Sequence, residues 1–252
     1  MNMRLVKKSI LIIGAGFFIC AASYAQSDLQ QFVGTGTDFA NLARTENAHS
    51  RMITGSGVNT FNPKEETVGH RYISADWMHG SVVDMKDTLF NNPSFLYNYD
   101  KMTQSLLLTQ DKQQVIEIYK DQIKSFTLKN NDLDVEYVRN PLMPEGPFLQ
   151  VITSGKKYIL SQTTTTKFIK SDYSTNGIAE SGNRYDEYKD NYTFYISEPG
   201  LKNIRKVELK RKAIKNAFLQ DEVAVKNFLN KSYTETLDGN FLRALVENLN
   251  NN

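Results

Sequence analysis

Histidines beside carboxylates are the residues of this sequence best suited to bind a metal or to transfer protons. The sequence holds His49, His70 and His79, with Asp76 and Asp84 nearby. The helical zinc motif needs two histidines four residues apart, with a glutamate after the first. His70 and His79 are nine residues apart, so the sequence predicts ordinary polar histidines and no metal site.

Serine nucleophiles of hydrolases sit in a glycine-flanked turn between a strand and a helix. Ser56 lies between two glycines, but no strand pattern precedes it. Ser81 follows Gly80 and leads into a predicted strand instead of a helix. The sequence therefore predicts no serine hydrolase.

Paired carboxylates are the remaining catalytic possibility. Asp134 and Glu136 share one side of a predicted strand, about 7 Å apart by strand geometry. Inverting glycosidases use such a separation, but every pair of residues two apart on a strand has it. Because both alternate with apolar residues, a solvated strand face is the better interpretation. We predict no enzyme, catalytic residue, cofactor or metal, and keep a glycan hydrolase using an unidentified carboxylate pair as the alternative.

Tyrosines gather in and beside a long polar loop. Tyr185, Tyr188, Tyr192 and Tyr195 follow one another among acidic residues. Because tyrosine joins a broad apolar ring to a polar hydroxyl, exposed clusters suit sugars or protein partners. The hypothesis is a ligand surface formed by Tyr185, Tyr188 and Tyr195. In the alternative, Tyr192 is buried and the others anchor the loop.

A basic run follows the last predicted strand. It comprises Lys202, Arg205, Lys206, Lys210, Arg211, Lys212 and Lys215. It suits weak contact with anionic lipid or with a phosphate-bearing glycan. Equally, it suits the solvated side of a strand and of the helix after it. No aromatic residues are interleaved with the basic ones, so no nucleic-acid partner is predicted.

The elements that position these residues change period along the chain. From 80 to 209, apolar and polar residues alternate, as in 133–138 and 192–197, which predicts strands. Short polar links favour antiparallel pairing. We expect separate strands at 158–163 and 165–170, and a long loop over 171–191.

After residue 209 the pattern becomes helical. It predicts a helix at 213–218, a second capped by Asp221, and a third over 238–250. The third has an apolar side formed by Phe241, Leu242, Leu245, Val246 and Leu249. Helices this short are unstable alone and must dock. The predicted fold is α+β: a mainly antiparallel β body, sandwich or partly closed barrel, with a C-terminal cap of two or three short helices.

The N-terminus of this 252-residue chain predicts export. Basic residues precede the apolar run 9–22, and small residues follow it, as in a secretory signal peptide cleaved between Ala25 and Gln26. The run is shorter than the roughly 20 residues of a membrane-spanning helix. Cleavage removes Cys20, the single cysteine, and with it any disulfide or thiolate chemistry. Cleavage also leaves 27 basic against 28 acidic residues, so no global positive field remains.

The predicted domains are therefore a signal peptide (1–25), a partly ordered N-terminal extension (26–76), the β body (77–209) and the C-terminal helices (210–252). No membrane span is predicted in the mature chain.

Several motifs resemble a family of exported proteins of Bacteroidota to which no activity is assigned. They are 79–84 (HGSVVD), 95–100 (FLYNYD), 105–128, the hairpin 155–160 (GKKYIL) and the lysine-rich tail 210–250. The resemblance covers roughly 77–250 without the tyrosine-rich loop. It implies export and a strand-rich body, and assigns no catalytic residue. The predicted function is an exported, non-catalytic protein of the cell envelope, periplasmic or associated with the outer membrane. It would bind an envelope protein or glycan, or serve as a structural module.

Overall fold

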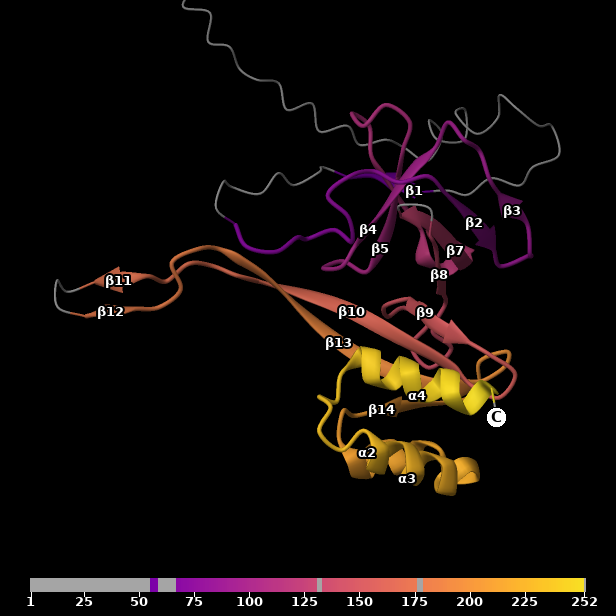
Figure 1. The fold of residues 1–252 in the computed structure, drawn as a ribbon. Coiled ribbons are helices and arrows are strands. Elements are labelled where there is room, and N and C mark those ends of the chain that lie inside the picture. The colour runs from indigo at the N-terminus through magenta and orange to yellow at the C-terminus, as the bar shows by residue number, and fades with distance from the viewer. Residues whose placement is uncertain (1–54, 59–66, 131–132, 176–178, 252) are drawn as a thin grey trace, which may run out of the picture. The chain divides into compact units, whose positions relative to one another are not determined.

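Residues 55–58, 67–130, 133–175 and 179–251 are described by the computed structural model, and all structural statements here refer to them. The predicted signal peptide, its cleavage site at Ala25 and Gln26, and His49 lie outside these ranges. The described residues belong to one compact unit, which Figure 1 shows as a ribbon.

The elements are mostly strands, with helices at the C-terminal end. The strands are β1 (Gly55–Gly57), β2 (Gly80–Asp84), β3 (Leu89–Phe90), β4 (Leu96–Asp100), β5 (Ser105–Thr109), β6 (Ile116–Ile118), β7 (Ile123–Asn130), β8 (Leu133–Val138), β9 (Leu149–Ser154), β10 (Ile159–Ile169), β11 (Ser174–Thr175), β12 (Glu180–Ser181), β13 (Glu187–Glu198) and β14 (Lys202–Val207). The α-helices are α2 (Arg211–Ala217), α3 (Glu222–Lys231) and α4 (Gly239–Asn251), and the 3-10 helices are η1 (Lys120–Gln122) and η2 (Leu219–Asp221). The predicted α+β class with a mainly antiparallel sheet is confirmed.

The strands form two main antiparallel sheets in the described ranges. One has the order β14-β13-β10-β9-β8-β7-β2-β3, and the other β1-β6-β5-β4. A small β11–β12 ladder stands apart. Neither main sheet closes on itself, so of the two predicted architectures the sandwich is the one found. β1 belongs to the second sheet, although its residues lie in the predicted N-terminal extension.

One row of residues crosses almost the whole eight-stranded sheet, and it shows how the core is divided. Residues paired across the ladders share one side of the sheet. The row consists of Val82, Phe126, Tyr137, Gln150, Gln162, Phe194 and Val207. Its two ends are apolar and buried, whereas the middle pair joins its side-chain amides, Gln162 Nε2 donating to Gln150 Oε1 at 3.0 Å. One side of the sheet therefore carries two apolar cores with a polar seam between them.

The first core lies between the four-stranded sheet and β2, β7 and β8. Its centre is aromatic: Phe126 stacks on Tyr137 with ring centroids 4.7 Å apart, and Phe148 meets Phe126 edge-on at 5.0 Å. Tyr99 from β4 contacts all three rings. Large rings in offset or edge-on contact bury much apolar area with favourable geometry, so this cluster holds the two layers together.

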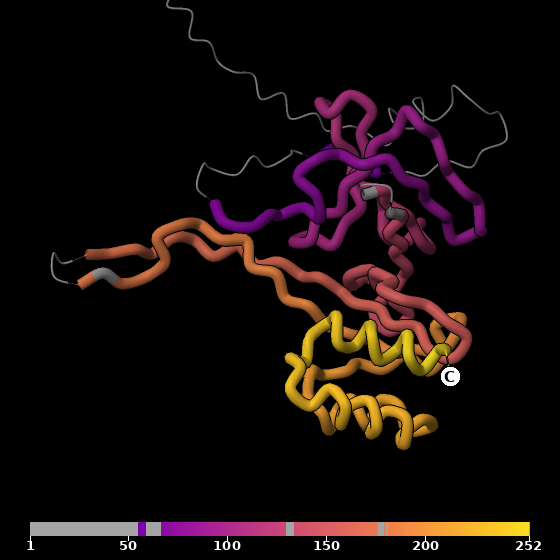
Figure 2. Tube along the Cα trace, viewed as in Figure 1, coloured from indigo at the N-terminus to yellow at the C-terminus, as the bar shows by residue number. Residues whose placement is uncertain are grey.

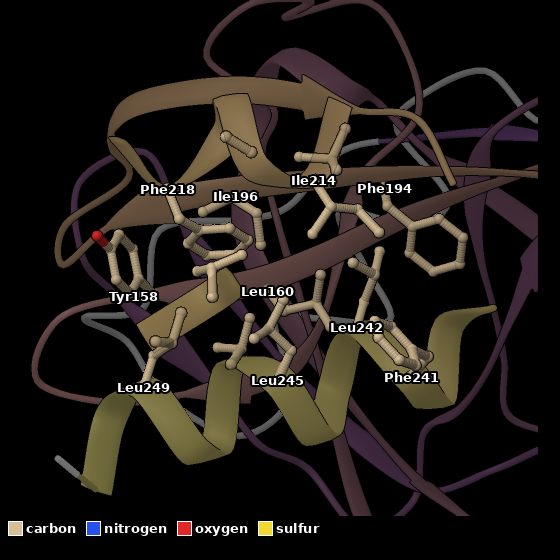
Figure 3. Close-up of a cluster of buried hydrophobic side chains, with 14 of the residues drawn as sticks. Tyr158, Leu160, Phe194, Ile196, Ile214, Phe218, Phe241, Leu242, Leu245 and Leu249 are labelled. Atoms are coloured by element: carbon tan, nitrogen blue, oxygen red, sulfur yellow. The ribbon is translucent and has the colours of Figure 1, made fainter. Parts of the chain in front are cut away.

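The second core lies beneath the C-terminal helices (Figure 3). The apolar side of α4 faces Leu160 of β10 and Ile196 of β13, and Ile214 and Phe218 reach the same cluster from α2 and its end. The α4 residues in the cluster are Phe241, Leu242, Leu245, Val246 and Leu249. They are the residues that the helical period predicts to face inward.

Asp221 does not cap α3 as the sequence predicts. It occupies the N-cap position, but its side chain makes no capping hydrogen bond. Its carboxylate instead accepts a hydrogen bond from the Tyr158 hydroxyl at 2.8 Å and lies 3.5 Å from Lys157 Nζ. A tertiary partner has thus replaced the local one. At α4, by contrast, Asp238 Oδ1 accepts the Phe241 backbone N–H at 2.8 Å, a true N-cap bond.

Asn250 fixes the other end of α4 to the β9–β10 turn. Its Oδ1 accepts the backbone N–H groups of Lys157 and Tyr158, at 3.1 and 2.9 Å, and its Nδ2 donates to the Tyr158 carbonyl at 3.0 Å. A Cβ at Gly155 would lie 2.2 Å from Asn250 Cγ, so a larger residue there would displace the Asn250 amide and its hydrogen bonds. The end of α4 and the β9–β10 turn therefore pack closely and are joined by hydrogen bonds.

Several buried phenols make the free energy of unfolding depend on alkaline pH. Burial raises the pKa of Tyr97 from the ordinary 10.0 to about 12, and burial with the Asp221 carboxylate raises the pKa of Tyr158 to about 12. Burial also raises the pKa of Tyr99 and Tyr137. The unfolded chain then loses these protons at lower pH than the folded chain. We expect the free energy of unfolding to fall as pH rises from 10 to 12, by up to about 1.4 kcal/mol per pH unit for each group. Urea unfolding followed across that window measures the slope.

Two variants separate Tyr158 from a general alkaline effect. Tyr158→Phe lacks the titrating hydroxyl and should show a shallower fall, whereas Tyr119→Phe, at a half-exposed ring, should follow the wild-type slope. An unchanged slope in Tyr158→Phe would show that this phenol does not contribute.

Candidate binding surface on the β10–β13 arm

The expected pair of strands at 158–163 and 165–170 is a single strand, and its length creates an arm. β10 runs without interruption from Ile159 to Ile169 and pairs with β13 along its whole length. The run of threonines between 163 and 166 suits an extended chain, since β-branched residues favour strands. The predicted loop over 171–191 is correspondingly shorter, because β13 already begins at Glu187.

The outer part of this hairpin extends past the neighbouring ladders. β9 pairs with β10 only up to Gln162, and β14 pairs with β13 only from Phe194. We call residues 163–175 and 179–193 the arm, and its segments 170–175 and 179–186 the tip. Figures 1 and 2 follow both strands to β11 and β12 at the far end.

A buried ion pair holds the inner arm. Lys101 Nζ, at the β4–β5 turn, lies 2.9 and 2.8 Å from the two carboxylate oxygens of Asp190. The Lys101 side chain is only 6% exposed, and that of Asp190 is 23% exposed. Thr166 Oγ1 and the Tyr192 hydroxyl also donate to Asp190, and the Lys101 carbonyl accepts the Thr166 N–H at 3.1 Å. Side chain and backbone together fasten the arm to the four-stranded sheet.

The segment 67–72 reinforces this attachment. Val68 forms a parallel bridge with β13: its N–H donates to the Asp186 carbonyl, and its carbonyl accepts the Tyr188 N–H, both at 2.8 Å. Three residues on, Arg71 Nε donates to Asp100 Oδ2 at 2.8 Å at the end of β4. The inner arm is thus tied at several points, and the tip extends beyond them.

The tip is stabilised by its own polar contacts. Asp186 Oδ1 accepts the Ser171 N–H at 2.8 Å, and Asp172 Oδ1 accepts the Asn183 N–H at 2.6 Å. The Arg184 guanidinium lies over the Tyr173 ring, 5.4 Å from its centroid. These carboxylates are used within the tip, so they shape the loop.

Aromatic rings remain exposed around the tip, but only one belongs to the predicted set. Tyr185 is 46% exposed, and Tyr173 and Phe168 are 38% and 40% exposed. Tyr188 and Tyr195 are 6% and 8% exposed, so neither offers its ring to a ligand. The hypothesis of a three-tyrosine surface is wrong for these two residues. The alternative in which Tyr192 is buried is wrong as well, because its side chain is 53% exposed.

Tyr188 and Tyr195 are covered for different physical reasons. Tyr188 packs its ring against Phe168, with centroids 5.0 Å apart, beneath the segment that carries Arg71. Tyr195 lies in the part of β13 that is paired on both sides, opposite Ser161 of β10 and Lys206 of β14. The missed residue Tyr173 had a usable signal, because it lies in the same polar stretch as Tyr185.

The basic run does not form one surface. Alternation along β14 places Lys206 opposite Tyr195 and Arg205 opposite Ile196, on different sides of the sheet. Arg211 donates to the carbonyls of Leu229, Ser232 and Tyr233 at the end of α3, at 2.8, 3.2 and 2.6 Å. Lys210 pairs with Glu208 at 2.8 Å.

The candidate catalytic residues are not brought together. His70 and His79 are exposed on the segment before β2, and Asp134 and Glu136 are exposed on β8. Ser56 lies in β1 and Ser81 in β2, without the strand-to-helix turn of a nucleophile. Asp84 Oδ1 accepts the N–H groups of Lys86 and Thr88, which shapes the β2–β3 turn. Among the described residues, no three metal-binding side chains gather.

One open depression does collect two carboxylates. Glu198 and Asp221 line a volume of about 390 Å³ between the β9–β10 turn, the β13–β14 turn and η2. The other lining residues are Lys156, Lys157, Tyr158, Pro199 and Gln220. Asp221 accepts a hydrogen bond from the Tyr158 hydroxyl at 2.8 Å and lies 3.5 Å from Lys157 Nζ, so its carboxylate is held in place in this depression.

Within the described ranges, no helix has both the length and the apolar character needed to cross a bilayer. Comparison with protein-family models gave no match, and comparisons with curated proteins and with solved structures gave none either.

Proposed function

We propose that the protein is an exported, non-catalytic binding module of the cell envelope, whose arm tip contacts an envelope protein or glycan. Export rests on the leader pattern and on the resemblance to exported proteins, with a periplasmic or outer-membrane-associated location. The observation that carries the binding role is the set of exposed rings on a fastened arm.

Two physical features support this role. Three apolar rings are exposed to solvent toward the outer end of the hairpin, those of Phe168, Tyr173 and Tyr185. Clustered exposed apolar groups are typical of interaction sites. The Lys101–Asp190 pair and the Val68 bridge fix the strands beneath them. A surface held in place before binding loses less conformational entropy when a partner docks.

A second function, hydrolysis of envelope glycans, is favoured by the shared depression of Glu198 and Asp221. Two carboxylates flanking a sugar bond are the usual machinery of glycoside hydrolysis. Here Glu198 and Asp221 would be the two carboxylates.

The test replaces both tip tyrosines by alanine, in the protein recovered from an exporting host. Aromatic residues dominate many interfaces, so Tyr173→Ala with Tyr185→Ala should lower binding to a purified envelope fraction by roughly tenfold or more. Sedimentation with the whole envelope and with protein-free cell-wall glycan measures the bound fraction. If the wild-type protein sediments with the protein-free glycan, the partner is a glycan. If it sediments only with the whole envelope, the partner is a protein.

The matched control is Tyr119→Ala with Tyr233→Ala, at rings that are 45% and 73% exposed outside the arm. It should bind as wild type does. Equal binding by both double variants would contradict the arm as the contact surface. Release of reducing sugar that stops in Glu198→Gln would establish the hydrolase instead.

A further inference from the structure

The helices α2 and α3 form a pair, and the inner side of this pair is buried in the second core. Ile214, Ala217 and Phe218 from α2 and its end, and Val225 and Leu229 from α3, are buried in the second core. The three hydrogen bonds of Arg211 to the end of α3 hold the start of α2 beside it, so the two helices run antiparallel. Figure 1 shows them side by side.

The outer side of the pair exposes large apolar residues where a water-facing helix would have polar ones. Leu219, in η2 between the helices, is 67% exposed, and Val223, in the first turn of α3, is 74% exposed. They are four residues apart, which places them at the same end of the pair. Neither contributes to the core, so folding of the chain does not explain them.

Lysines flank these two residues. Lys212 and Lys226 are exposed, and Lys215 is half-buried one turn before Leu219. Among the described residues, none of the three forms an ion pair. Residues 201–233 as a whole hold nine lysines and arginines against three acidic residues, whereas the full chain is close to neutral. The charge is therefore concentrated in this part of the chain.

We propose that this surface, formed by Lys212, Lys215, Leu219, Val223 and Lys226, docks on an anionic lipid membrane. Leu219 and Val223 enter the boundary between headgroups and acyl chains, and the lysine ammonium groups contact lipid phosphates. Exposed apolar side chains with lysines nearby are typical of interfacial membrane contact, in which each basic charge adds to the attraction. A membrane is favoured over a protein groove because the apolar residues protrude and lysines outnumber the acidic residues around them. Of the two carboxylates between Leu219 and Val223, that of Asp221 is bound by Tyr158 and Lys157, and that of Glu222 is exposed. The proposal does not depend on the arm or on its partner.

The test measures flotation of the exported protein with vesicles of phosphatidylglycerol and phosphatidylcholine in equal parts, and with vesicles of phosphatidylcholine alone. All samples come from the same exporting host, so the N-terminal segment is constant. Wild type should bind the anionic vesicles at least about tenfold better. Salt should release it, because the screening length falls from about 10 Å at 0.1 M to about 3 Å at 1 M.

Two pairs of variants locate the contact. Leu219→Glu with Val223→Glu, and separately Lys212→Glu with Lys226→Glu, should each reduce binding about tenfold or more. The controls make the same chemical changes elsewhere: Leu89→Glu with Leu142→Glu, at side chains 61% and 57% exposed, and Lys86→Glu with Lys112→Glu at exposed lysines.

The controls should bind within about twofold of wild type, because they change composition and net charge by the same amount. All the substituted residues lie at the surface, so each variant should keep the wild-type unfolding midpoint. Equal binding to both vesicle types, or equal losses in test and control variants, overturns the proposal.

Discussion

Replacing Lys101 by methionine should lower the free energy of unfolding by about 3 kcal/mol, a loss typical of breaking a buried ion pair. The change removes the ammonium group and leaves the Asp190 carboxylate largely covered, with only the Thr166 and Tyr192 hydroxyls as side-chain donors. Methionine keeps a similar length, so packing changes little. Urea unfolding measures the loss, and limited proteolysis of the arm should show earlier cleavage there.

The second variant in this test removes both charges. Lys101→Met with Asp190→Asn should recover much of the loss, because no unpaired charge then remains buried. A loss below about 1 kcal/mol in the single variant, typical of surface pairs, would contradict a stabilising role of the Lys101–Asp190 pair. A double variant whose loss of unfolding free energy equals the sum of the two single losses would also contradict it.

Replacing Phe218 by alanine should cost about 3–5 kcal/mol, the usual range for a fully buried aromatic residue. Its side chain is completely buried between the helices and the sheet, and its ring meets Tyr158 edge-on with centroids 5.0 Å apart. The cavity would lie where α2 ends, where Ile214 and Val225 also pack. Urea unfolding measures the effect.

The neighbouring residue supplies a matched control. Leu219 is 67% exposed and belongs to no core, so Leu219→Ala should change stability by about 0.5 kcal/mol or less. Two adjacent apolar residues would then differ several-fold in effect. Similar losses in both variants would contradict the docking of the helices that the second core shows.

The two proposed contact surfaces rest on different chemistry. The arm tip offers aromatic rings within a polar loop, and the α2–α3 surface offers leucine and valine among lysines. Each surface is tested with its own control variants, so the results can contradict one proposal and support the other. If both hold, the protein links an envelope partner to a lipid surface without needing a catalytic residue.

Local periodicity predicted much of the fold. Strand β8 and helix α4 have clear periods of two and 3.6 residues, and both form where expected, with the predicted side of α4 buried. Short polar links predicted antiparallel neighbours, as found for β7 and β8. Such patterns are readable because each depends only on residues close together in the chain.

The same reasoning failed where polarity does not alternate. The threonines of β10 are polar on both sides of the strand, so the sequence suggested a break where the ladder is continuous. Asp221 had the type and position of a helix cap, yet a tyrosine 63 residues earlier in the chain binds it. A contact of this kind has no local signature.

By itself, the sequence determined the α+β class, the helical C-terminal cap and the concentration of basic charge between 201 and 233, and it predicts export. Only the tertiary structure decided which tyrosines are covered: Tyr188 is buried by residues from the segment before β2, while Tyr185, three positions away, stays exposed. It likewise decided that Leu219 and Val223 protrude while Phe218 and Val225 are buried. The physical reason is that periodicity and composition are properties of neighbouring residues, whereas burial depends on segments that only folding brings together.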